Sequence, residues 1–114
     1  MLIAEDIRQC WMSALENLSV AEELDKEGNF HEAVDKAIWA VILGSGAATK
    51  LSEELKDAAL KDTASSVLAD WVERRMAVDG GKRHCTTKET LQWAVKSLQR
   101  LYDAAPLDVL PPLR

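Results

Sequence analysis

Two groups of carboxylates are the residues in this sequence best suited to chemistry. Each combines adjacent acids with a further acid three or four positions on: Glu22, Glu23 and Glu27 in the first group, and Glu53, Glu54 and Asp57 in the second. Carboxylate oxygens are ligands that Mg²⁺ prefers. If the two groups met in the fold, Glu22, Glu23, Glu54 and Asp57 could hold a magnesium ion. The alternative, which we prefer, is that they lie on solvated helix faces and that the protein uses no metal or other cofactor.

The second acidic group resembles half of a known motif. Glu54-x-x-Asp57 is similar to the second part of the pattern of MazG-like all-α pyrophosphohydrolases, E-E-x-x-E followed by E-x-x-D. This resemblance implies magnesium-dependent hydrolysis of nucleotides. The first part departs from the pattern, because the acid due after Glu22-Glu23 is replaced by Lys26. A nucleotide pyrophosphohydrolase is therefore an alternative hypothesis to a non-enzymatic protein.

Cys85 is a candidate reactive thiol. It follows the basic run Lys82-Arg83-His84 and comes just before a helix that is expected from Thr86 onwards. Nearby cations and a helix N-terminus both favour the reactive thiolate. The sequence identifies no acid that would orient His84, so the alternative is a loop thiol without a chemical role.

Composition and charge narrow the class of protein. The chain has 114 residues, of which 47% are hydrophobic and 29% charged, as expected for one globular domain. Its formal net charge of −5 makes nucleic-acid binding unfavourable. The longest apolar run, residues 37–43, is far shorter than the ~20 residues of a membrane span. Without a signal-peptide pattern or a cysteine framework, we expect a cytoplasmic protein that does not enter a membrane.

Apolar residues recur at spacings of three and four in four segments, which predicts four helices. The expected helices cover residues 3–27, 29–51, 52–79 and 86–105. The segment Gly44–Thr49 allows either a continuous helix or a break, and we favour continuity. The short connections favour an antiparallel up-down four-helix bundle, as a single domain over residues 1–105. Residues 106–114 contain three prolines and are expected to form an extended C-terminal tail, which covers the chain's own apolar surface or docks into a partner.

The first expected hairpin, residues 14–43, carries a resemblance of its own. Its turn, Gly28-Asn29-Phe30 followed by Ala33-Val34, is similar to the turns of tetratricopeptide hairpins and of HEPN-type four-helix bundles. No second copy of the pattern follows, as a tetratricopeptide array would require, so the HEPN-type bundle accounts better for the chain. Catalytic HEPN ribonucleases place an arginine a few residues before a histidine. Here Arg74 and Arg75 stand too far before His84, so the resemblance implies a toxin–antitoxin component without that catalytic motif.

The four tryptophans fall one to each expected helix. Trp11 and Trp71 lie within the apolar stripes of their helices, as core residues do. Trp93 lies about 140° from the centre of its helix's apolar stripe, and Trp39 lies almost opposite its own, beside Leu43. Aromatic residues away from the core are enriched at contact surfaces, so Trp39, Leu43 and Trp93 are predicted to form an interface. The alternative is that the helix of Trp39 is central and that Trp93 lies over lysine and arginine stems.

These observations favour a non-enzymatic helical-bundle protein that acts through protein–protein contact. A homodimer is the simplest assembly that would cover the predicted interface, and a different protein partner is the other possibility. The hydrolase and the HEPN-like component are the alternatives.

Overall fold

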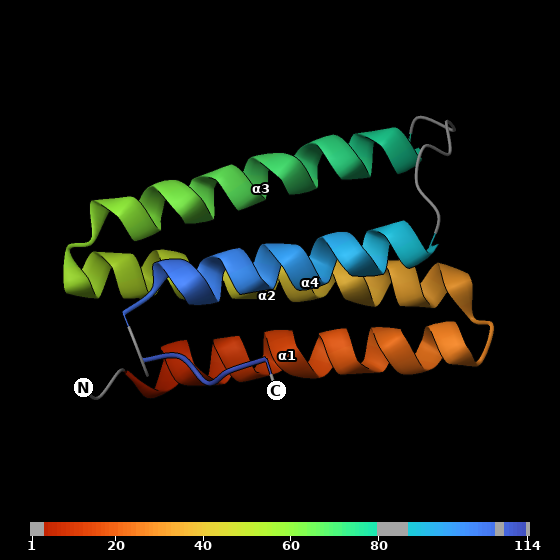
Figure 1. Ribbon diagram of the computed structural model, residues 1–114, viewed down its shortest axis with the longest axis horizontal. Helices are drawn as coiled ribbons and strands as arrows, with labels where there is room; N and C mark the ends of the chain where they lie inside the picture. Colours follow the sequence, from red (N-terminus) through yellow and green to blue (C-terminus); the bar gives the residue numbers. More distant parts are fainter. Residues whose placement is uncertain (1–3, 80–86, 107–108, 114) are drawn as a thin grey trace.

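The fold is all-α, with four helices. The computed structural model describes residues 4–79, 87–106 and 109–113. Its helices are α1 (Glu5–Lys26), α2 (Phe30–Leu55), α3 (Ala58–Asp79) and α4 (Thr87–Ala104). Successive helices run in alternating directions (Figure 1), as short connections require. The predicted fold class is confirmed.

The helices form two layers around α2. Helices α1 and α3 flank α2, and α4 packs across α2 from one side (Figure 1). The molecule measures 41 × 25 × 19 Å, and its shortest dimension is about twice the 10 Å diameter of a helix. Helix α2 thus contacts all three other helices, and α4 covers only one side of the layer that α1, α2 and α3 form.

Small residues let the helices approach α2 closely. Its buried residues include seven of the smallest types: Ala33, Ala37, Ala40, Gly44, Ser45, Ala47 and Ala48. A Cβ atom added at Gly44 would overlap the side chain of Leu98 on α4 and would lie 3.5 Å from the Trp11 ring on α1. The stretch from Gly44 to Thr49 is helical, so the prediction of a continuous helix is confirmed.

The boundary between the second and third helices was predicted wrongly. Ser52 was expected to start a new helix, but α2 continues to Leu55. Ser52 is buried, and its hydroxyl donates to the Thr49 carbonyl at 2.6 Å. The break comes at Lys56, whose φ of 54° is left-handed, and Asp57 then caps α3 by accepting a hydrogen bond from Leu60 N at 3.1 Å. A side-chain cap on the first orphan N–H groups therefore sets the start of α3.

The first turn lies where the sequence placed it. Gly28 has a φ of 81°, the left-handed conformation that glycine adopts without steric cost. Asn29 precedes α2, but its side chain makes no capping hydrogen bond. Phe30 lies on the same side of α2 as the buried Ala37 and Val41, yet it is 51% exposed, because it lies at the end of its helix, where neighbouring helices give less cover.

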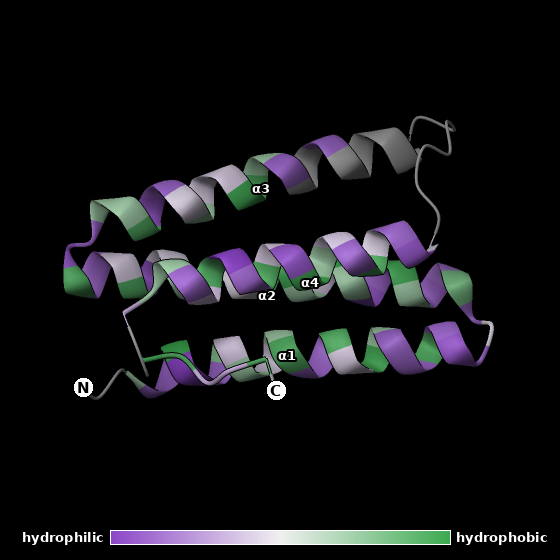
Figure 2. Ribbon diagram, viewed as in Figure 1, coloured by the Kyte–Doolittle hydropathy of each residue, from purple (hydrophilic) through white to green (hydrophobic). Residues whose placement is uncertain are grey.

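Helix α4 shows how much packing can shift a buried face. Its apolar pattern is clear, and polar and apolar residues alternate along α1 and α4 in Figure 2. Val95 belongs to the apolar stripe of this helix by its spacing from Leu91 and Leu98, yet it is 40% exposed. The residues that are buried are Thr90, Leu91, Ala94, Ser97, Leu98 and Leu101. Their centre is rotated by about 40° from the apolar centre that the sequence predicts, because α4 packs against α3 as well as α2.

The tail after α4 folds back onto its own bundle. Its described part, residues 109–113, runs along α1 (Figure 1), and Val109 and Leu110 are buried. The Trp11 indole Nε1 donates to the Pro111 carbonyl at 2.7 Å. The tail therefore covers apolar surface of its own chain, the first of the two arrangements expected from the sequence.

Candidate interaction surface on the outer side of α2

Three of the four tryptophan side chains are described, and only Trp39 is largely exposed. Trp11 is completely buried, whereas the Trp39 side chain is 51% exposed near the middle of α2. The side chain of Trp71 lies outside the described residues. A large apolar side chain in the middle of a helix, half open to water, is the kind of residue that marks a contact surface.

Trp93 lies differently from the prediction, which had it pointing away from the core. Its side chain is half-buried and packs against the core. Trp93 and Arg100 are two helical turns apart and so share a side of α4. Arg100 reaches α3, where its guanidinium lies 3.3 Å from the Asp70 carboxylate. Trp93 is therefore on the side of α4 that α3 covers, and the polar neighbours that suggested a solvated face belong to a helix–helix contact.

The outer surface of α2 is the side of this helix opposite its buried residues. By helix geometry, six residues form its central part: Asp35, Trp39, Ile42, Leu43, Gly46 and Lys50. Ile42, Leu43 and Gly46 are half-buried, and Asp35 and Lys50 are exposed. Leu43 also borders α1, because its carbonyl accepts a hydrogen bond from Cys10 Sγ at 3.2 Å. The outer surface thus has an apolar centre with one charge of each sign toward its two ends.

Gly46 presents no side chain on this surface. A Cβ atom added there would meet nothing within 4 Å, in contrast to the crowded site two residues earlier at Gly44. Gly46 and Trp39 are seven positions apart and lie on the same side of α2. The outer surface of α2 therefore presents its largest side chain and its smallest residue two turns from each other.

The charges on this surface have only loose partners. Lys50 Nζ lies 4.0 Å from Asp6 Oδ2, and His31 Nε2 lies 3.8 Å from Asp35 Oδ2. Exposed pairs at such distances contribute little to stability. Asp35 and Lys50 are therefore available to an incoming molecule at little energetic cost.

The two acidic groups are not brought together. Glu22 and Glu23 lie near the end of α1, whereas Glu54 lies in the last turn of α2 and Asp57 caps α3. Because α1 and α2 are antiparallel, the two groups lie at opposite ends of the bundle, about 30 Å apart from the rise of 1.5 Å per residue. Among the described residues, no group of three histidine, cysteine or acidic side chains is placed to hold a metal ion.

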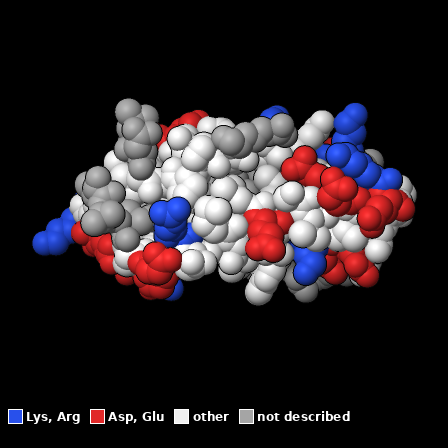
Figure 3. All heavy atoms as spheres, turned by 90° about the horizontal axis from the view of Figure 1, so that it is seen from below, with Lys and Arg blue, Asp and Glu red and all other residues white. Residues whose placement is uncertain are grey.

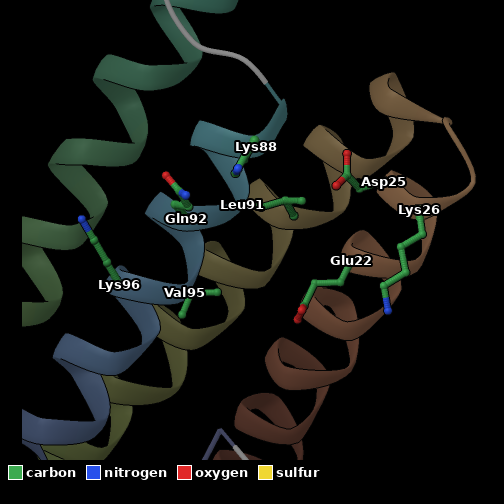
Figure 4. A pocket seen from close by; sticks show the side chains of 8 residues that line it. All are labelled: Glu22, Asp25, Lys26, Lys88, Leu91, Gln92, Val95 and Lys96. Carbon is green, nitrogen blue, oxygen red and sulfur yellow. The ribbon is translucent and has the colours of Figure 1, made fainter.

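A groove between α1 and α4 was not predicted. It has a volume of about 530 Å³ and lies between the end of α1 and the start of α4 (Figure 4). Leu91 and Val95 form its apolar part, and its rims carry the charged and polar side chains of Glu22, Asp25, Lys26, Lys88, Gln92 and Lys96. Acidic and basic side chains also mix at this end of the molecule when it is viewed from the side of α1 (Figure 3). The only sequence signal was Val95, an apolar residue at the edge of its stripe.

Cys85 and His84 lie outside the described residues, so the structure gives no geometry for the candidate reactive thiol. In the described helices, none is long and apolar enough to cross a membrane. Comparison of the chain with models of known protein families, with curated proteins and with solved structures finds no match.

Proposed function

We propose that this chain is a non-enzymatic helical-bundle protein that acts through protein–protein contact and self-associates through the outer surface of α2. The observation that carries the proposal is the 51% exposure of Trp39 in the middle of the helix that contacts all three others. Half-buried Ile42 and Leu43 lie beside it. Covering this cluster removes apolar area from water, at about 25 cal/mol for each Å², and a two-fold dimer covers it with one surface.

The solution mass tests this proposal. We expect light scattering to give twice the 12.6 kDa of one chain for the wild type. The Trp39→Ala variant should give the mass of a single chain, because it removes the largest apolar side chain of the surface. Interface aromatics of this kind cost about 2 kcal/mol or more when truncated.

Phe30→Ala provides the matched control. Phe30 is also aromatic, also on α2 and also 51% exposed, but it lies at the first residue of the helix, three turns away from the centre of the surface. This variant should remain a dimer. A wild type that is monomeric over a wide concentration range would refute self-association. If Trp39→Ala and Phe30→Ala weakened the dimer equally, the role of this surface would be refuted.

The geometry gives the nucleotide pyrophosphohydrolase no comparable support. That hypothesis needs Glu22 and Glu23 near Glu54 and Asp57, and the structure places these pairs at opposite ends of the bundle. The antiparallel hairpin of α1 and α2 is compatible with a HEPN-like bundle, but it is a feature that any tight helical hairpin shares. Self-association through α2 is therefore the function that we carry forward.

A further inference from the structure

We infer that the partner on the outer surface of α2 is a second copy of this chain in antiparallel orientation, with Trp39 of each copy seated over Gly46 of the other. This inference rests on the proposed self-association and adds the partner's orientation and register. It places the two-fold axis between Ile42 and Leu43. A residue on one side of the axis then faces, in the second copy, the residue that lies at the same distance from the axis on its other side.

Shape is the first argument for this register. Trp39 and Gly46 are equally distant from the point between Ile42 and Leu43, about 5 Å along the helix on either side. Trp39 projects from the surface with half of its area exposed, and the space above Gly46 is open for at least 4 Å around a Cβ position. The antiparallel pairing therefore sets the largest side chain of this surface against its residue without a side chain, twice in each dimer.

Charge is the second argument. Asp35 and Lys50 are also equally distant from the axis, about 11 Å along the helix. In the antiparallel register the Asp35 carboxylate faces the Lys50 ammonium of the second copy, and both are exposed with only loose partners of their own. A parallel pair would instead set Asp35 against Asp35 and Lys50 against Lys50. Opposite charges across an interface favour one orientation over the other.

One pair of like charges lies farther out. Glu32 would face Glu53 of the second copy, and both residues are exposed. A parallel pair would set Glu32 against Glu32 and Glu53 against Glu53, so this repulsion is present in both orientations and favours neither.

Charge reversal tests the orientation. By sedimentation of the purified chain, Asp35→Lys and Lys50→Asp should each weaken the dimer about tenfold, because each leaves two like charges facing one another across the axis. The double variant Asp35→Lys/Lys50→Asp should regain the wild-type affinity. In a parallel dimer, each residue faces the same residue of the second copy. The two single variants would then not weaken the dimer and the double variant would not restore it.

Gly46→Leu tests the seat for Trp39. The site is open in one chain, and leucine is a better helix former than glycine. In a Trp39→Ala background, which removes the contribution of self-association, Gly46→Leu should therefore not lower the thermal stability. It should nevertheless weaken the dimer more than tenfold, because the new side chain occupies the space over which Trp39 packs.

The outcomes separate the two proposals. A monomeric wild type would overturn both self-association and the antiparallel register. A second outcome is a dimer that Trp39→Ala abolishes, that the double charge variant does not restore and that Gly46→Leu does not weaken. This outcome would overturn the register alone and leave self-association through α2 standing.

Discussion

Gly44 and Gly46 show how one helix uses the same residue type for two purposes. Both lie in the middle of α2, and Gly44 faces inward where Leu98 and Trp11 meet the helix backbone. Gly46 faces the outer surface, where a Cβ atom would meet open space. The first glycine is needed for close packing inside the chain. The second has no such role in one chain, which is why a role between chains is of interest.

The two glycines should respond oppositely to alanine. Gly46→Ala should raise the free energy of unfolding by about 0.5–1 kcal/mol, since alanine loses less backbone entropy in a helix. Gly44→Ala should lower it by about 1–3 kcal/mol, because the fully buried side chain of Leu98 would have to shift within the core.

Urea denaturation of both variants in a Trp39→Ala background would measure these effects without a contribution from self-association. Equal changes at the two positions would contradict the close approach of α4 to α2.

At the scale of elements, the C-terminal tail acts as a fifth packing unit. Its described residues 109–113 belong to no helix or strand, yet Val109 and Leu110 are as buried as core residues of the helices. The Trp11 indole, buried in the core of α1, finds its acceptor in the tail at Pro111. The tail thus covers apolar side chains and also satisfies a buried polar group.

Truncating the buried leucine of the tail should therefore destabilise the fold as much as truncating a leucine of the helical core. Leu110→Ala should lower the free energy of unfolding by about 2–3 kcal/mol, the range for buried leucines, as measured by urea denaturation. Leu113→Ala is the matched control, because Leu113 is only half-buried in the same segment, and its effect should be clearly smaller. A change below about 0.5 kcal/mol for Leu110→Ala, the size of ordinary surface effects, would show that the tail is not anchored there.

For the molecule as a whole, the decisive feature is the unequal covering of its two sides. Helix α4 packs on one side of the layer formed by α1, α2 and α3, and Trp39 lies on the side of α2 that these helices leave open. The described residues leave the Trp39 side chain 51% exposed on this side. A second copy covers this side by the simplest closed symmetry.

Self-association should then appear in the thermal stability. Because a dimer is favoured by mass action, the melting temperature of the wild type should rise with protein concentration, as measured by circular dichroism over a wide dilution series. The Trp39→Ala variant should melt at one temperature throughout the series. A wild-type melting temperature that is independent of concentration would contradict folding coupled to dimerisation.

Features that depend on a few neighbouring residues were predictable from the sequence. Gly28 takes the left-handed conformation at the first turn, the helix continues through Gly44–Thr49, and Trp11 and Ala14 lie in the buried stripe of α1. These features follow from local sterics and from the 3.6-residue period, which act before any tertiary contact forms. The exposure of Trp39 was predictable for the same reason, since the 3.6-residue period places it opposite Phe30, Val34 and Val41.

Only the tertiary structure decided which sides of the helices are covered by a neighbouring helix, and which residues distant in sequence lie close together. Trp93 has charged neighbours along α4, but α3 packs on that side and covers it. Val95 has apolar neighbours, yet it lies beside the groove between α1 and α4. Glu54 and Asp57 were separated by a turn, and both ended far from Glu22. Each outcome depends on where a second helix lies, and that position is set by packing summed over many residues of the whole bundle.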